Sequence, residues 1–136
     1  MQRLETLGVC VLGFGTEYFP GFYLSSSGER VDWTVRTPEE VAAVMAAQDT
    51  LGGPEAAVIV ANPVPEAEQL DPGLHDRVLA EALDESRERG ITGQAVTPFL
   101  LAELTRRTGG ASLEANLAAV RGNVQLAARI AVARTR

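Results

Sequence analysis

Lysine is absent from this chain, because all twelve of its basic residues are arginines. With no side-chain amine, the chain cannot by itself form the lysine Schiff base that covalent carbonyl chemistry uses. It also has only one cysteine and one histidine, which excludes a disulfide framework and a metal site built from these two residue types. The single thiol, Cys10, lies in an apolar run, which is typical of a small core residue in a reduced, cytosolic protein.

An excess of positive charge is lacking as well. The twelve arginines are dispersed and are outnumbered by eighteen acidic residues, so the formal net charge is −6. This balance argues against a nucleic-acid partner, because it offers little to neutralise a phosphate backbone. No apolar run approaches the roughly 18 residues that span a bilayer, and the N-terminus does not resemble a secretory signal. We therefore expect a soluble, cytoplasmic protein with no membrane partner.

The pattern of apolar residues predicts short strands in the first half of the chain. Residues 1–7 resemble the tail of a helix, and the continuous apolar runs 9–12 and 56–61 are typical of buried strands in an α/β sheet. Residues 13–28 are rich in glycine, aromatic and hydroxyl side chains, and we interpret them as a long loop with a short strand near 21–24. At 136 residues the chain is long enough for one packed core, so we expect residues 1–136 to form a single unit.

One helix is predicted between the two strands. Thr37 and Glu40 have the spacing of a capping box, and Pro38 occupies the first turn, where its missing N–H costs nothing. The helix should continue to about Leu51, and the glycines and proline at 52–54 should stop it.

The second half of the chain predicts three more helices. The first covers residues 71–90, and its charged residues are expected on a solvated face with weak pairing. Thr97 as N-cap and Pro98 at the first helical position start the second, and the glycines at 109–110 allow a left-handed exit from it. Ser112 then starts the last helix. Together these elements predict an α/β fold of about four helices on two or three short strands.

Three asparagines stand out in the sequence. Asn116 and Asn123 share one stripe of the last helix among apolar residues, and buried amides need partners. Asn62 follows the second strand, at the sheet edge where ligands of α/β proteins usually bind, although a plain turn explains it equally well. The stripe expected to face the core consists of Leu113, Leu117, Val120, Val124 and Ala127.

Other candidate sites are weak. Gly13 and Gly15 lack the third glycine and the following helix of a dinucleotide-binding fingerprint. His75 is expected at the surface, and Glu17 in the aromatic loop is expected to be solvated, although its neighbours could perturb it. The sequence assigns no general acid–base pair.

A set of motifs spread over essentially the whole chain resembles the C-terminal half of the pseudouridine-5′-phosphate glycosidase family. The motifs are Leu4-Glu-Thr-Leu-Gly-Val9, Gly13-Phe-Gly-Thr16, Phe19-Pro-Gly-Phe-Tyr23, Ser27-Gly28, Thr37-Pro-Glu-Glu-Val41, Val60-Ala-Asn-Pro-Val-Pro65, Thr97-Pro-Phe-Leu-Leu101 and Ser112-Leu-Glu-Ala-Asn116. The resemblance implies cleavage of the C–C glycosidic bond of pseudouridine 5′-phosphate to uracil and ribose 5-phosphate. It also implies a divalent metal, usually manganese, and a homotrimer of α/β subunits.

The resemblance implies that the catalytic residues lie outside this chain. The family's lysine that attacks the anomeric carbon, its proton-shuttling glutamate and its metal-binding aspartate all precede the matched region, so no catalytic or metal-ligating residue is assigned here. Asn116 matches the family asparagine that reaches into the substrate pocket, and it is the one substrate-binding residue assigned. An ordinary helix-end amide bonded to nearby backbone is the alternative reading.

Two hypotheses from different classes follow. In the first, the chain is the C-terminal part of the glycosidase, inactive alone and completed by an N-terminal half polypeptide or within a homo-oligomer. In the second, it is a noncatalytic interaction module or a truncated gene product. An independent small-molecule binder is a third possibility, which would need ligand-dependent stabilisation of the isolated chain.

Overall fold

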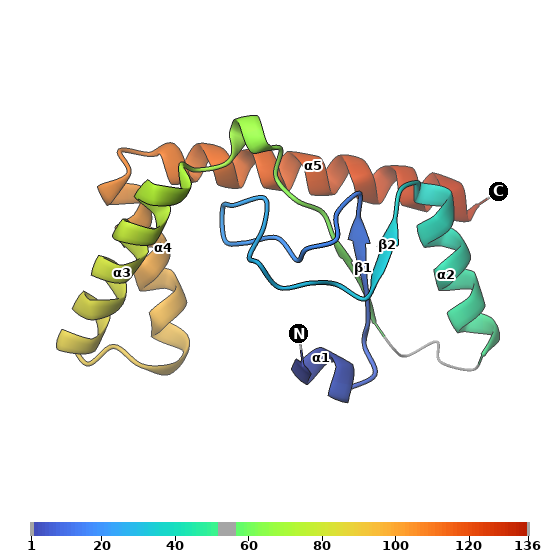
Figure 1. Cartoon of the computed structure of the whole chain (residues 1–136), viewed down its shortest axis with the longest axis horizontal. Helices are drawn as coiled ribbons and strands as arrows, with labels where there is room; N and C mark the ends of the chain where they lie inside the picture. Colours follow the sequence, from blue (N-terminus) through green and yellow to red (C-terminus); the bar gives the residue numbers. More distant parts are fainter. Residues whose placement is uncertain (1, 52–56, 136) are drawn as a thin grey trace.

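The structure, a computed structural model, describes residues 2–51 and 57–135 and contains a three-stranded parallel sheet in the order β2-β1-β3 (Figure 1). The strands are β1 (Cys10–Phe14), β2 (Trp33–Val35) and β3 (Val58–Ala61). Leu12 of β1 is the register partner of both Trp33 and Val60. Because the strands are parallel, their carboxyl ends meet at one edge of the sheet.

Five α-helices accompany the sheet in the described part of the chain. They are α1 (Gln2–Thr6), α2 (Pro38–Thr50), α3 (Pro72–Glu88), α4 (Val96–Arg107) and α5 (Ala111–Arg134), with 3-10 turns at Glu66–Glu68 and Gly93–Ala95. Figure 1 shows α5 running along one side of the molecule, from the α3 and α4 pair at one end to α2 at the other. The predicted α/β class is confirmed. None of the described helices is both long and apolar enough to cross a membrane.

The predicted capping box at the start of α2 is confirmed. The Glu40 amide donates to Thr37 Oγ1 at 3.2 Å, and the Thr37 amide donates to Glu40 Oε2 at 3.3 Å. The same carboxylate accepts a bond of 2.6 Å from the Arg36 amide. Two orphan donors of the helix start are thereby satisfied. The predicted stop at residues 52–54 and the predicted strand residue Ala56 lie outside the described residues.

Two strand assignments in the first half differ from the prediction. Residues 21–24 form bends instead of a strand, because Tyr23 has a φ of +67°, which no strand residue adopts. The sequence analysis missed β2. This strand is only three residues long, and Trp33 and Thr34 are exposed, so it lacks the apolar run that marks a buried strand.

The predicted starts of α4 and α5 are also wrong. Thr97 lies inside α4, which begins at Val96 after a 3-10 turn and has no side-chain cap. Helix α5 begins at Ala111, one residue before Ser112, and Gly110 occupies its N-cap position with a left-handed φ of +92°. Ser112 is instead fully buried, where its amide donates to Thr108 Oγ1 at 3.1 Å. The two glycines do provide the left-handed exit that was predicted.

Two clusters of buried apolar residues hold the elements together. The first joins the loop after β1 to α3, α4 and the start of α5. It contains Tyr23, Leu70, Val78, Leu104 and Ala115. The second joins the sheet to α2 and contains Leu12, Val35 and Val41, with Ile130 of α5 packed against it. Helix α5 therefore contributes to both clusters. The expectation of a single unit over residues 1–136 stays a prediction.

The core-facing stripe predicted for α5 is wrong. Leu113, Leu117, Val120 and Val124 are between 38% and 64% exposed, and Ala127 is exposed as well. The buried residues of α5 are Ser112, Ala115, Ala118 and Leu126, most of them small. Small side chains let the helix lie close to its neighbours, whereas the larger aliphatic residues point to a face that no described element covers.

Candidate functional site

A cavity of about 390 Å³ opens at the carboxyl end of β3, which belongs to the edge where α/β sheets bind ligands. Three elements form its walls: the loop 19–24 that follows β1, the end of β3, and the middle of α5. The polar side chains among its lining residues include Asn62, Asn116 and Asn123. The cavity therefore gathers the three asparagines that the sequence analysis singled out.

Asn62 and Asn123 are directly hydrogen-bonded to each other. Asn62 Nδ2 donates to Asn123 Oδ1 at 3.0 Å, which joins the end of β3 to α5 across 61 residues of sequence. Asn62 is half-buried and Asn123 is exposed. Pro63 follows Asn62 and restricts its backbone to extended conformations, so the amide projects from a rigid position.

Asn116 lies two helical turns before Asn123 and is exposed at the cavity wall. Tyr23 lines the same cavity, and both residues also line a neighbouring hollow of about 440 Å³ against α4. No hydrogen bond within the described residues is recorded for the Asn116 carboxamide, so its N–H and C=O groups are available to a ligand. The alternative, in which the Asn116 amide is hydrogen-bonded to nearby backbone, has no such bond among the described residues to support it.

The loop 19–24 is held in a strained conformation. Tyr23 is buried with its φ at +67°, a rare value for an aromatic residue, and its ring lies 4.3 Å from that of Phe22. The Leu70 amide donates to the Tyr23 carbonyl at 3.0 Å, and the Ser25 amide donates to Gln69 Oε1 at 2.9 Å. Burial raises the pKa of the Tyr23 phenol, so this group stays neutral at physiological pH.

Gly13 brings the strand end close to the loop that follows it. A Cβ atom at this position would lie 2.2 Å from the Thr16 carbonyl oxygen and 2.7 Å from Val31 Cγ2. Gly15 has a left-handed φ of +66°. The two glycines are therefore required by the turn out of β1, which explains a Gly-x-Gly pattern without a nucleotide.

A larger cavity of about 560 Å³ lies between α2, β3 and the second half of α5. Most of its lining is aliphatic, and the Asn62 and Asn123 pair lines it at one end. At the other end Arg134 forms an ion pair with Asp49 at 2.7 Å. Because Asn116 and the aromatic side chains of the loop 19–24 line the smaller cavity and not this one, we assign the candidate site to the smaller cavity.

The remaining sequence candidates lie away from this cavity or are satisfied locally. Glu17 is exposed and pairs with Arg30 at 2.8 Å, as expected for a solvated carboxylate. Cys10 is half-buried, and burial raises the pKa of its thiol. The surface position predicted for His75 is wrong: the residue is 5% exposed, because it shares the face of α3 that carries Val78. Its Nδ1 lies 3.0 Å from Asp76 Oδ1, and its Nε2 has no hydrogen-bond partner among the described residues.

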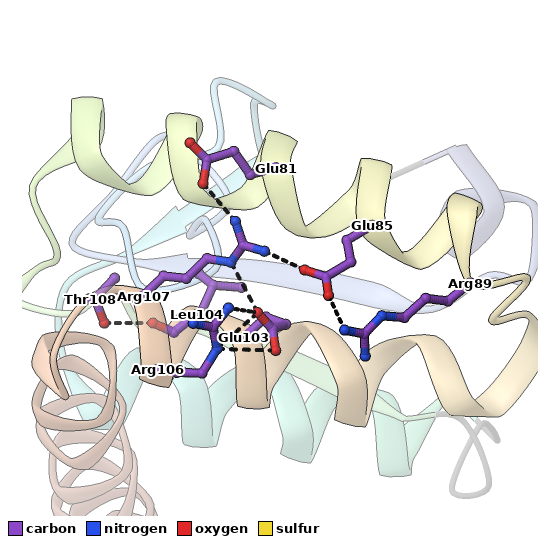
Figure 2. A network of polar contacts seen from close by, with 8 residues as sticks. All are labelled: Glu81, Glu85, Arg89, Glu103, Leu104, Arg106, Arg107 and Thr108. Atoms are coloured by element: carbon purple, nitrogen blue, oxygen red, sulfur yellow. Dashed lines mark hydrogen bonds and ion pairs between the residues drawn. The ribbon is translucent and has the colours of Figure 1, made fainter.

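The charged residues of α3 were predicted to be solvated, but several of them join a network with α4. Figure 2 shows the Arg107 guanidinium between the two helices, where it binds Glu81 at 2.7 Å, Glu103 at 3.0 Å and also Glu85. Hydrogen bonds from Arg106 and Arg107 lower the pKa of Glu103 to about 2. The same bond to Glu103, followed by that to Glu81, raises the pKa of Arg107. None of these charged groups lines the candidate cavity. We therefore assign the network a structural role, which is to hold α3 against α4.

The described residues do not fit a manganese site. No group of three or more histidine, cysteine, aspartate or glutamate side chains in residues 2–51 and 57–135 could hold a metal ion. The cavity is instead lined by aromatic, aliphatic and carboxamide groups, which are poor ligands for a hard divalent cation in the absence of carboxylates.

Comparisons with known proteins agree with this fold. A family model described as "Indigoidine synthase A like protein" matches residues 1–133. The pseudouridine-5′-phosphate glycosidase of Streptomyces griseus is 77% identical over 133 residues, which are 98% of this chain and 41% of that protein. The protein of the same name from Salinispora tropica is 55% identical, with the same two coverages. The chain thus spans about two fifths of the length of these relatives.

Solved structures give the same picture. An indigoidine synthase A-like protein from Thermotoga maritima superposes with a TM-score of 0.85 at 37% identity, over 99% of this chain and 44% of that one. The prealnumycin C-glycosynthase in complex with ribulose 5-phosphate gives a TM-score of 0.75 at 30% identity, over 99% and 46%. These matches confirm the predicted resemblance to the C-terminal half of pseudouridine-5′-phosphate glycosidases. The chain belongs to the indigoidine synthase A-like family.

Proposed function

We propose that this chain forms the C-terminal half of a pseudouridine-5′-phosphate glycosidase and supplies one wall of its substrate pocket. The observation that carries the proposal is the identity of 77% over 133 residues to a protein of that name. The reaction adds water across the C–C glycosidic bond of pseudouridine 5′-phosphate, giving uracil and ribose 5-phosphate.

Within this reaction we assign Asn116 to substrate binding. Its carboxamide can both donate and accept a hydrogen bond, and it is exposed at the wall of a cavity at the ligand-binding edge of the sheet. The loop 19–24 covers the same cavity with aromatic side chains, which suit the flat face of a nucleobase. The function of this chain is thus to bind and orient the substrate.

The covalent step requires an amine that this chain does not have. Every basic residue is an arginine, and a guanidinium does not form an imine with a sugar. We infer that the lysine, the proton-shuttling glutamate and the manganese ligands belong to the rest of the family polypeptide. The chain alone is then inactive, and its partners are an N-terminal half and further copies in a trimer, in the cytoplasm.

The proposal is tested by reconstitution. The chain is produced together with the remaining part of a family polypeptide, joined or separate, and uracil release from pseudouridine 5′-phosphate is measured by chromatography with manganese present. We expect release from the assembly and none from the chain alone. A soluble, stoichiometric assembly that releases no uracil would contradict the proposal, and so would turnover by the purified chain without any companion.

A noncatalytic interaction module is the second candidate. The exposed aliphatic stripe of α5 favours it, because a contiguous apolar face marks an interaction surface. An assembly that forms through α5 but lacks glycosidase activity would support this alternative.

A further inference from the structure

We propose that Asn62 and Asn123 form a base-recognition pair that reads the urea edge of the uracil ring, a C=O group flanked by N–H groups. The inference rests on the proposed function and adds a specificity determinant that is separate from Asn116. It starts from the single hydrogen bond of 3.0 Å that joins the two carboxamides at the wall of the candidate cavity.

The bond leaves the pair with a defined set of unused groups. A carboxamide has two N–H donors and an oxygen with two lone pairs. The bond uses one donor of Asn62 and one lone pair of Asn123, so Asn123 keeps both N–H donors and Asn62 keeps its oxygen. Because the carboxamides are coupled, the pair offers one donor and one acceptor side by side, whichever of the two amides donates the bond.

This set is complementary to one edge of the substrate's base. In pseudouridine the ring is linked to the sugar through C5, so the opposite edge carries the C2 carbonyl between the N1–H and N3–H groups. An Asn123 N–H can donate to the carbonyl while the Asn62 oxygen accepts from an adjacent N–H. In an N-linked nucleoside, N1 bears the sugar and cannot donate, so the two N–H groups flank the carbonyl only in the C-linked substrate.

The spacing along α5 allows Asn116 and the Asn62–Asn123 pair to contact different parts of the substrate. Asn116 and Asn123 are seven residues apart on α5, or about 10.5 Å along the helix at 1.5 Å per residue. One carboxamide can therefore act near the scissile bond while the pair contacts the far edge of the base. Both members of the pair belong to regular elements or their ends, and their mutual bond fixes the orientation of each amide.

The experiment compares pseudouridine 5′-phosphate with its N1-methyl and N3-methyl derivatives, using the active assembly described above. Each methyl group removes one N–H of the urea edge. We expect wild type to lose about tenfold or more in kcat/KM with at least one derivative, because the derivative lacks an N–H that the pair binds and its methyl group meets the carboxamide instead. In Asn62→Ala and Asn123→Ala, KM for the unmodified substrate should rise more than kcat falls. In these variants the ratio of kcat/KM between the unmodified and the methylated substrate should drop to about threefold or less, since alanine leaves room for the methyl group.

Controls separate recognition from stability. Gln125→Ala removes an exposed amide of α5 that does not line the cavity, and it should leave both KM and the substrate ratio unchanged. If an alanine variant does not fold, Asn62→Ser or Asn123→Ser, which also remove the carboxamide and leave room for the methyl group, are compared with wild type by the same ratio. Equal losses with all three substrates would overturn the inference, because a structural role alone lowers activity uniformly. An inactive wild-type assembly would instead refute the proposed function, and the inference with it.

Discussion

Because Gly13 has no Cβ atom, β1 can turn into the segment that leads to the loop 19–24. The hypothetical Cβ distance of 2.2 Å to the Thr16 carbonyl oxygen is far below van der Waals contact, and the clashing atom belongs to the backbone. The turn that places residues 19–24 over the cavity therefore depends on glycine at this position. This requirement is steric, and it holds whatever ligand the cavity binds.

We expect Gly13→Ala to lower the free energy of unfolding by about 1–3 kcal/mol, because either the strand or the loop must move. Urea denaturation followed by circular dichroism measures this change. Gly73→Ala is the matched control, since a Cβ there would meet only the Asp71 carboxylate, at an ordinary contact distance of 3.4 Å. Equal stability of the two variants would show that the approach of Thr16 is not tight.

Asn116 is the residue whose substitution should affect function without affecting the fold. Asn116→Ala removes an exposed side chain, so its effect on the free energy of unfolding should stay within about 0.5 kcal/mol. In the assembly, uracil release should fall by about a hundredfold or more, as when a positioned hydrogen-bonding group is lost from an active site. Steady-state kinetics measures the loss. Activity close to that of wild type would remove Asn116 from the substrate pocket.

Sequence reasoning at the residue scale identified amides but not their contacts. Asn62, Asn116 and Asn123 were singled out from spacing and position, and all three line one cavity. The bond between Asn62 and Asn123 could not be predicted, because it joins residues 61 positions apart. His75 was placed at the surface because its helix is mostly polar, and its buried side is defined only by the packing of α3 in the fold.

At the scale of elements, two local signals were reliable, whereas the caps predicted at Thr97 and Ser112 were not. The capping box at Thr37 and the two glycines before α5 act within a few residues, and both have the predicted local geometry. The stripe of α5 depended instead on which neighbour lies beside the helix. The larger aliphatic residues of that stripe are exposed, because α5 packs against its neighbours through small residues such as Ala115 and Ala118. Amphipathic spacing alone does not distinguish these two faces.

The ion pairs of Glu103 with Arg106 and Arg107 on α4 should be sensitive to acid. The pKa of Glu103 is about 2 in the folded chain, against an ordinary value of 4.5, so its folded-state contribution is complete above pH 4.5. That contribution is lost as the pH falls from 4.5 toward 2, when Glu103 becomes protonated and its ion pairs with Arg106 and Arg107 are lost. We expect Glu103→Gln to be less stable than wild type at pH 6 and the gap to close near pH 2.

Thermal unfolding at a series of pH values measures this gap. Glu88→Gln, which removes an exposed carboxylate from α3, controls for the change in net charge. A gap between Glu103→Gln and wild type that stays constant from pH 6 to pH 2 would contradict the assignment of the ion pairs in Figure 2.

At the scale of the whole molecule, the chain spans about two fifths of the length of its relatives. The sheet has three strands, and parallel sheets are normally covered on both faces. The exposed stripe of α5 agrees with a fold that continues elsewhere. The lack of lysine, evident from composition alone, is the reason that we propose the covalent step for that other part.

Trapping of the covalent intermediate tests whether the imine-forming lysine lies outside this chain. Borohydride reduction of the assembly in the presence of ribose 5-phosphate should leave a sugar adduct, because an imine is reduced to a stable amine. Peptide mapping by mass spectrometry should locate the adduct on a lysine outside this chain and leave the side chains of residues 1–136 unmodified. An adduct on one of these side chains would refute the assignment.

The position of α5 has a mechanical consequence. Ala115 packs in the cluster around Tyr23, and Ile130 packs against the cluster beneath α2, so fifteen residues, or about 22 Å of continuous helix, separate the two anchors. A helix of this kind is stiff along its axis, and no loop interrupts it. A ligand that shifted α5 at Asn116 would therefore move the far end of the helix with it as one rigid displacement, without passing through the sheet.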